Sequence, residues 1–459
     1  MAALRGLVRA GESTGRGAPT DGGAAPVVLA LLVALGAFAV GSAQLGRIET
    51  GAYSERITLA EGHELVAGHQ RFGVVRYTHF PNGPLYLVAA MTAAGLEPSA
   101  MRLVPVGLAA VCFGLLAWAL ASWVPTRSLR AWVVAATGVL LLQPAVFLWM
   151  GALHEHSYAF SMVLLLMATS VRVTPRRSWL LFPLGFVSGW IGYDWLPGQA
   201  MTVLTIRWLV LAGDEETPLL EAAAMASLDS LKFASGACLA VLAHLIQLAL
   251  FFDSWDQAAR DLLGAAAARA NAGGASQINP EYQRFIEQDL QRLQRAYASR
   301  PELAAMLGSD FSVHHPPRLR LTAMLYQQFR LPRWSNIWLL AATTLAGIGV
   351  MATRGFRSVV GSRAVPVGAL GAALAVAAPA VWVFLMPEHA VSHLHMLPRH
   401  ILVPVALLLA LPALLARPAG THPPAARLVP RAFARATALY ALWPVLLAAA
   451  GLHAALTLG

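Results

Sequence analysis

The most constraining feature of this sequence is a series of apolar runs, most of them long enough to cross a bilayer as a helix. A transmembrane helix needs about 20 apolar residues, with about 17 as a lower limit. The runs that qualify or nearly qualify are 26–44, 102–124, 131–150, 156–171, 179–193, 196–212, 232–252, 336–353, 365–386, 400–416 and 436–457. They predict an all-α, polytopic membrane protein with about 11 transmembrane helices.

Composition argues against several soluble domains. Residues of the set AVILMFWYC make up 57% of the 459 residues and charged residues 12%, whereas a soluble domain carries about 25% charge. The same apolar content excludes intrinsic disorder. The net charge of +10 comes from arginines between apolar runs, not from a basic soluble face with interleaved aromatics, so we expect no nucleic-acid partner.

The arginines predict the orientation of the chain. If the N-terminus is cytoplasmic and the short apolar piece 83–96 does not cross, every short arginine-rich connection falls on the cytoplasmic side, as the positive-inside rule requires. If 83–96 did cross, all later connections would invert. We therefore predict that 83–96 lies along the outer surface as an interfacial or re-entrant helix.

This topology divides the chain into four parts. They are a cytoplasmic tail 1–25, an N-terminal transmembrane module 26–252 with an outer loop 45–82, an outer helical segment 253–335, and C-terminal transmembrane helices 336–459. Within the outer segment, helices are expected at about 254–271 and 280–307. The stretch between them is rich in glycine, which predicts a break at that point.

The outer side collects the residues that could carry chemistry. Glu49, Tyr53 and Glu55 come soon after the first span. The run from His79 to Tyr86 (HFPNGPLY) then opens the short apolar piece. Two further spans are entered through Arg102-Leu103-Val104-Pro105 and through Pro398-Arg399-His400-Ile401-Leu402-Val403-Pro404.

Together these segments resemble the GT-C superfamily of membrane glycosyltransferases, in its branch related to protein O-mannosyltransferases and the aminoarabinose transferase of lipid A. In that branch an acidic motif follows the first span, a His/Lys-Pro-Pro-Leu-Tyr run opens an amphipathic helix, and Arg-Leu-Pro and Pro-Arg-Tyr…Pro entries follow. The chain matches these four motifs with Glu49 and Tyr53, with His79 to Tyr86, with Arg102 to Pro105, and with Pro398 to Pro404.

The match has three departures. Asn82-Gly83 is inserted into the pair of prolines, His400 replaces the tyrosine, and the doubled acidic pair of the family is reduced to Glu49 alone. The resemblance covers about 45–124 and 397–412.

The resemblance implies transfer of a sugar from a polyprenyl-phosphate donor to an acceptor on the extracytoplasmic face of a bacterial cytoplasmic (inner) membrane. The partners would be the lipid-linked sugar donor and membrane lipids. Such a reaction needs a carboxylate to deprotonate the acceptor hydroxyl and cations to stabilise the departing phosphate. Glu49 is the first candidate for the base and Glu55 the second. Arg399 is the first candidate for the phosphate clamp and Arg102 the second, and His79, Tyr53 and His400 are candidate substrate-binding residues.

For two further groups of residues on the outer side, the sequence leaves open whether the role is functional or structural. His154, Glu155 and His156 could join His393 and His395 to bind Zn²⁺ or Mn²⁺. The alternative for these residues is polar capping at the membrane interface. A divalent metal is therefore the one cofactor that the sequence leaves open.

Asp194 lies between two spans and is either a turn residue or an acid facing a cavity, which makes it a third catalytic candidate. The rival functions are a transporter or flippase for lipid-linked glycans and a non-catalytic scaffold. A transporter often shows internal repeats with polar groups at mid-membrane, which the sequence does not display.

Overall fold

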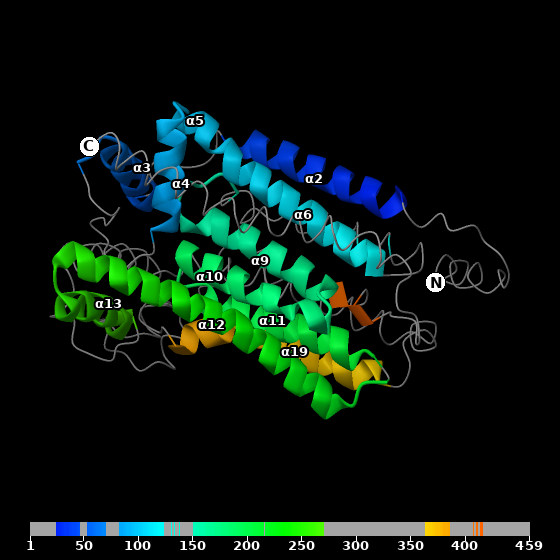
Figure 1. Cartoon of the computed structure of the whole chain (residues 1–459). Helices are drawn as coiled ribbons and strands as arrows, with labels where there is room; N and C mark the ends of the chain where they lie inside the picture. The colour runs from blue at the N-terminus through cyan, green and yellow to red at the C-terminus, as the bar shows by residue number, and fades with distance from the viewer. Residues whose placement is uncertain are drawn as a thin grey trace, which may run out of the picture.

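The structure is a computed structural model, and it describes residues 24–45, 53–69, 82–123, 130, 133, 137, 150–214, 216–269, 363–385, 407, 410, 411, 414 and 415. Every element in these ranges is a helix, and they contain no strand. Figure 1 shows the long helices lying side by side in one bundle. The predicted all-α fold is confirmed for this part of the chain.

The bundle is built from seven longer helices: α2 (Ala24–Gln44), α6 (Leu103–Trp123), α9 (Glu155–Arg172), α10 (Leu181–Ile191), α11 (Leu196–Ala212), α12 (Leu219–Phe252) and α19 (Ala364–Leu385). Three stretches among the described residues are long and apolar enough to cross a membrane: Ala25–Ala43, Pro98–Trp123 and Leu219–Phe252. The chain therefore has the helices of a membrane-associated protein.

Two of the predicted helices differ from the observed ones. The run 179–193 is split into a short 3₁₀ helix, η2 (Pro175–Leu180), and α10. Helix α12 begins at Leu219 instead of 232, because the residues before 232 favour a helix without being apolar enough to mark a span.

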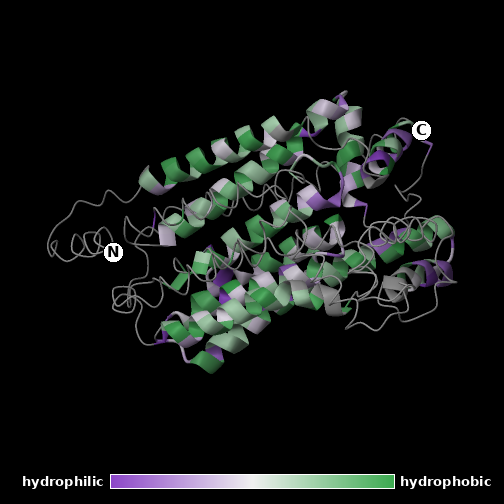
Figure 2. Ribbon diagram, turned by 180° about the vertical axis from the view of Figure 1, so that it is seen from behind, coloured by the Kyte–Doolittle hydropathy of each residue, from purple (hydrophilic) through white to green (hydrophobic). Residues whose placement is uncertain are grey.

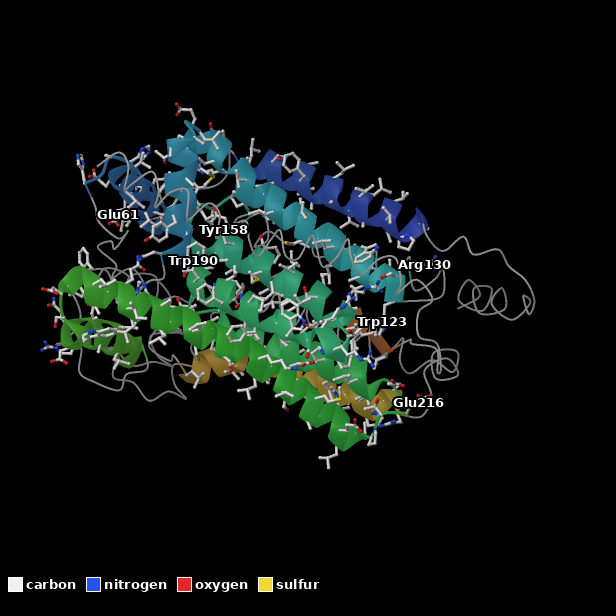
Figure 3. All side chains as sticks on the ribbon, viewed as in Figure 1. Glu61, Trp123, Arg130, Tyr158, Trp190 and Glu216 are labelled. Atoms are coloured by element: carbon white, nitrogen blue, oxygen red, sulfur yellow. The ribbon has the colours of Figure 1, made fainter. Side chains whose placement is uncertain are left out.

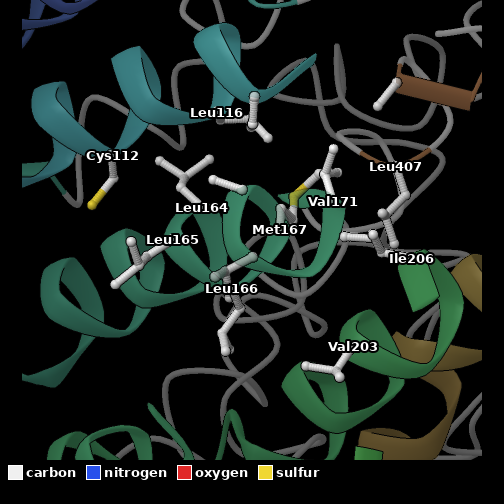
Figure 4. Packing of buried hydrophobic residues seen from close by; sticks show 14 of the residues in the cluster. Cys112, Leu116, Leu164, Leu165, Leu166, Met167, Val171, Val203, Ile206 and Leu407 are labelled. Atoms are coloured by element: carbon white, nitrogen blue, oxygen red, sulfur yellow. The ribbon is translucent and has the colours of Figure 1, made fainter. Parts of the chain in front are cut away.

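The core lies between α6, α9 and α11. Helix α6 packs against α2 on one side and α9 on the other, while α11 contacts α9, α12 and α19. Figure 4 shows Leu116 of α6 facing Leu164 and Val171 of α9, with Ile206 of α11 and Leu407 nearby. Almost every residue of α9 is buried, which is the behaviour expected of a helix that is surrounded by other helices.

Helices α10 and α12 approach each other through glycine. A Cβ atom added to Gly185 of α10 would lie 1.9 Å from the carbonyl oxygen of Phe233, and one added to Gly236 of α12 would lie 1.9 Å from that of Phe182. Both contacts involve backbone, so neither can be relieved by turning a side chain. Small residues that let backbones approach are the usual way in which helices associate in lipid.

Short helices lie at one end of the bundle. They are α3 (Tyr53–Val66), α4 (Gly83–Ala93), α5 (Pro98–Met101) and α13 (Trp255–Arg269). Helix α3 occupies a segment that was expected to be a loop, whereas α13 agrees with the helix expected at about 254–271. Figure 1 shows α4 running across the direction of α6 and α9. We call this end of the bundle the α4 end.

The opposite end holds the end of α6, the end of α9, η2 and the start of α12, and we call it the arginine end. Figure 2 shows apolar residues along the helices and hydrophilic ones toward both ends of the bundle, with α3 and α13 among the hydrophilic parts. Figure 3 shows Glu61, Tyr158 and Trp190 toward the α4 end and Trp123, Arg130 and Glu216 at the arginine end.

A buried ion pair ties the helices together at the arginine end. Arg207 of α11 is 0% exposed. Its Nε donates to Oδ2 of Asp229 on α12 at 2.8 Å, and its Nη1 donates to the carbonyl oxygens of Ser170 at 3.1 Å and Val173 at 2.8 Å. Lys232 donates to the other oxygen of Asp229 at 2.9 Å. The pair therefore joins α9, α11 and α12.

Candidate active site

The α4 end contains a buried ion pair between Glu55 and Arg102. Glu55 lies in the first turn of α3 and is 1% exposed, and Arg102 lies between α5 and α6 and is 9% exposed. Both Nε (2.9 Å) and Nη2 (2.7 Å) of Arg102 donate to the same oxygen, Oε1 of Glu55. The second oxygen, Oε2, is buried and has no hydrogen-bond partner among the described residues.

The local sequence explains how Arg102 reaches this position. Gly95 ends α4 with a φ of +73°, a left-handed conformation that glycine adopts without strain. Pro98 then opens α5, because proline fits the first turn of a helix. This tight turn brings Arg102 back over α3, where it meets a carboxylate 47 positions earlier in the chain.

Tyr158 on α9 lies close to this pair. Its side chain is 2% exposed, and its hydroxyl has no hydrogen-bond partner among the described residues. The charge of Glu55 acts on this hydroxyl. A buried tyrosine hydroxyl usually finds a partner, so Oε2 of Glu55 and the Tyr158 hydroxyl are two buried polar groups whose hydrogen-bonding capacity the described residues do not use.

Helix α4 closes the α4 end of the bundle, and its residues Gly83 to Met91 are buried. A Cβ atom on Gly83 would lie 2.5 Å from the carbonyl oxygen of Trp190 at the end of α10, so only glycine fits there. Tyr86 stacks on Trp190 with ring centroids 6.2 Å apart, and its hydroxyl accepts a hydrogen bond from Nε2 of Gln247 on α12 at 2.8 Å. These contacts hold α4 against α10 and α12.

Burial raises the pKa of the Tyr86 hydroxyl from 10.0 to about 12, against the opposite effect of the hydrogen bond from Gln247. Asn82 caps the start of α4 without a side-chain capping bond, and its buried Nδ2 has no hydrogen-bond partner in the described part of the chain. Asn82 is therefore a third buried polar group with unused capacity at the α4 end.

The run from His154 to His156 also lies at the α4 end, and all three side chains are buried. His154 precedes α9 in extended conformation, so its ring is not directed away from that of His156 as it would be two residues apart on a helix. The two rings contact each other with centroids 4.5 Å apart. Glu155 lies against Gly192, where an added Cβ atom would be 2.8 Å from its Oε2. Asp194 is buried in the turn between α10 and α11, two residues beyond Gly192.

Among the described residues, no group of three or more His, Cys, Asp or Glu side chains is arranged to hold a metal ion. His393 and His395, the other half of the predicted metal site, lie outside the described residues. A divalent metal therefore stays a prediction.

The structure does not describe all the candidate residues. Glu49, His79, Arg399 and His400 lie outside the described residues, and so does the side chain of Tyr53, which opens α3. The candidates that the structure brings together are Glu55 and Arg102. Sequence reasoning had given them separate roles, as a second base and a second phosphate clamp.

Sequence reasoning missed Tyr158 altogether. A tyrosine in the first turn of an apolar run, directly after His154, Glu155 and His156, was the available signal. It also missed the Arg207–Asp229 pair, although an arginine inside a predicted span is itself a sign of a buried partner.

Comparisons with protein-family models, with curated protein sequences and with solved structures find no match to this chain. The function must therefore be argued from the α4 end itself.

Proposed function

We propose that the chain is a membrane glycosyltransferase that moves a sugar from a polyprenyl-phosphate donor to an acceptor hydroxyl, with its active site at the α4 end. The observation that carries the proposal is the buried Glu55 carboxylate. One oxygen is held by Arg102, and the other has no hydrogen-bond partner among the described residues. A general base needs a carboxylate held in position with an oxygen left to take the proton.

The reaction that we propose balances as a single displacement. The acceptor hydroxyl gives its proton to Oε2 of Glu55 as its oxygen bonds to the anomeric carbon of the sugar. The bond between that carbon and the phosphate oxygen breaks, and the polyprenyl phosphate leaves with the electron pair. The Tyr158 hydroxyl would donate a hydrogen bond to the acceptor or to a sugar oxygen.

Arg399, the first candidate from the sequence, keeps the role of phosphate clamp in this proposal, and Arg102, the second candidate, takes another role. Arg102 uses two of its N–H groups on Glu55 and is almost fully buried, so it is a positioning residue for the base. Arg399 remains the candidate from the sequence for bidentate contact with the donor phosphate.

The spacing of polar residues supports placing the α4 end at headgroup depth. At 1.5 Å per residue, Asp229 and Gln247 on α12 are about 27 Å apart along the helix, and Glu155 and Arg172 on α9 about 26 Å apart. The hydrocarbon core of a bilayer is about 30 Å thick. A polyprenyl phosphate carries its charge at the same interface. Helix α4, about 16 Å long, is too short to cross, so we keep the proposal that it lies along the outer surface.

A transporter would need polar groups along a path through the bundle. Between the two ends, the hydroxyl of Ser188 on α10 and the amide of Gln199 on α11 are bonded to each other, and Gln199 also donates to the carbonyl oxygen of Ala159 at 3.5 Å. These hydrogen bonds join α9, α10 and α11 to one another, which is a structural role and gives no support to a transport path.

The test measures donor turnover in proteoliposomes that contain sugar-loaded polyprenyl phosphate, with the free lipid phosphate quantified by mass spectrometry. Glu55→Gln keeps the size of the side chain but removes its basicity, so turnover should fall about 100-fold or more while donor binding persists. Glu64→Gln is the matched control, because Glu64 lies on the same helix, is exposed and bonds His69.

Glu49→Gln decides between the two candidate bases. A 100-fold loss in Glu49→Gln with near wild-type turnover in Glu55→Gln would return the role of base to Glu49. Wild-type turnover in both variants, or turnover absent from the wild type with every donor tested, would contradict the enzyme proposal.

A further inference from the structure

The connection between α9 and α10 carries an organised set of positive charges. Helix η2 contains Arg176 and Arg177 in succession, and both side chains are exposed. Neither side chain makes a hydrogen bond or an ion pair with any described residue. Two exposed guanidinium groups therefore follow each other along η2 at the arginine end, with no partner in the described part of the chain.

Lys232 of α12 adds a third positive charge, and its position is fixed. Its Nζ donates to Oδ1 of Asp229 at 2.9 Å and to the hydroxyl of Ser178 within η2. The Ser178 hydroxyl in turn donates to the carbonyl oxygen of Pro175 at 2.9 Å. Lys232 is 31% exposed, and of its three N–H donors one is left without a partner among the described residues.

The acid beside these groups does not cancel their charge. Asp229 is buried and already paired with Arg207 at 2.8 Å, and this pair is neutral as a unit. The surface formed by Arg176, Arg177 and Lys232 therefore keeps three positive charges. Trp179, next in η2 after Ser178, is 62% exposed, and exposed tryptophans at the ends of apolar helices commonly sit at the level of lipid headgroups.

From this arrangement we infer that the arginine end holds a binding site for the phosphodiester headgroup of an anionic phospholipid, formed by Arg176, Arg177 and Lys232. Each guanidinium group can donate two parallel hydrogen bonds to phosphate oxygens, and Lys232 supplies one further donor from the neighbouring helix. Trp179 would pack against the glycerol region of the same lipid. The inference does not depend on the glycosyltransferase proposal.

If these basic residues only set the membrane topology, Lys232 would not need to be held in a fixed position by hydrogen bonds. The positive-inside rule is satisfied by any lysine or arginine near a span end, whether it is tethered or not. At this site the lysine is held by Ser178 of η2 and by Asp229 of its own helix α12, and η2 packs against α12. Basic sites between transmembrane helices are known to bind anionic headgroups.

The experiment is native mass spectrometry of the full-length protein in a non-ionic detergent, with dioleoyl phosphatidylglycerol as the probe. We expect one phosphatidylglycerol to bind saturably, and dioleoyl phosphatidylcholine to bind at least tenfold more weakly. The variant R176Q/R177Q should weaken phosphatidylglycerol binding about tenfold. The control R56Q/R260Q removes two exposed arginines from α3 and α13 at the α4 end and should bind like the wild type.

A second variant separates headgroup recognition from topology. R176K/R177K keeps both charges, and so keeps membrane insertion, but it loses the planar donor pairs. We expect binding about threefold weaker than in the wild type. Wild-type affinity in both R176Q/R177Q and R176K/R177K would overturn the inference and leave these arginines as a topology signal only.

Inorganic phosphate distinguishes the source of the phosphate group. If inorganic phosphate displaces phosphatidylglycerol at equal concentration, the site binds free phosphate and the lipid assignment is wrong. If it does not compete below a large excess, the lipid assignment is supported.

Discussion

Both ends of the bundle bury an arginine against a carboxylate, but they use the carboxylate differently. At the arginine end, Oδ2 of Asp229 accepts from Arg207 and Oδ1 accepts from Lys232. At the α4 end, both donors of Arg102 converge on Oε1 of Glu55, and Oε2 has no partner among the described residues. A buried acceptor without a partner costs about 1–3 kcal/mol.

The difference supports the proposal that one pair is structural and the other catalytic. With both oxygens of Asp229 engaged, this carboxylate serves to join helices. The carboxylate at the α4 end keeps an unused acceptor beside an unused hydroxyl, that of Tyr158. Nη2 of Arg207 is also buried without a partner among the described residues, but it is a donor and cannot accept a proton. The unused acceptor of Glu55 is therefore what supports our proposal of chemistry at the α4 end.

The largest loss of stability should follow Asp229→Asn. The change leaves Arg207 buried without a counter-charge, and arginine cannot escape by losing its proton. We expect the free energy of unfolding to fall by about 3–5 kcal/mol, measured by thermal and detergent-driven unfolding. Asp256→Asn on the exposed face of α13 is the control and should change stability by less than about 0.5 kcal/mol. An equally small effect of Asp229→Asn would remove the contrast between the two ends.

Arg102→Gln should cost less, because the glutamine amide can still donate one hydrogen bond to Oε1 of Glu55 in place of the two from Arg102. We expect a loss of about 1–3 kcal/mol, measured by thermal unfolding. Turnover should fall as well, since Arg102 holds the proposed base in position. A loss of stability as large as that of Asp229→Asn would show that the two ion pairs contribute alike.

Gly185→Ala should destabilise the bundle by about 1–3 kcal/mol, because the new methyl group meets the backbone of Phe233 and forces α10 away from α12. Gly107→Ala is the control, since no atom lies within 4 Å of its Cβ position. That change should be neutral or slightly stabilising. Equal unfolding midpoints for both variants would show that α10 and α12 are not held by this contact.

Tyr86→Phe should have the smallest effect, about 0.5–1.5 kcal/mol, because it removes one hydrogen bond and keeps the stacking on Trp190. The pKa of the Tyr86 hydroxyl is raised by burial from 10.0 to about 12. The unfolded chain therefore ionises first, and the wild type should lose stability relative to Tyr86→Phe between about pH 10 and pH 12. Unfolding curves at pH 8, 10 and 11 measure this difference, and a constant difference would contradict it.

Much of the helical framework could be predicted from the sequence, because hydropathy reads long apolar helices directly. The run 196–212 coincides with α11, and 26–44 and 102–124 lie within two residues of α2 and α6. Hydropathy reports apolarity and not helicity, which is why α3 was expected as a loop and the first residues of α12 were missed.

The candidate site could be predicted only in part. Glu55 and Arg102 were each selected for their position beside a span, but their pairing depends on the turn at Gly95 and on the packing of α3 and α4 on the bundle. Such long-range contacts leave no periodic signal. Tyr158 was passed over because it lies within the apolar run 156–171, and only the structure shows that its buried hydroxyl has no partner among the described residues.

The reciprocal contact of Gly185 and Gly236 has a consequence for biogenesis. The ribosome synthesises α10 first, then α11, and α12 only after both, so the glycine face of α10 can contact α12 only after all three helices are made. Backbones can approach this closely only where the glycine of each helix faces the backbone of the other. The two glycines therefore favour close docking of α12 beside α10 once α12 has been synthesised.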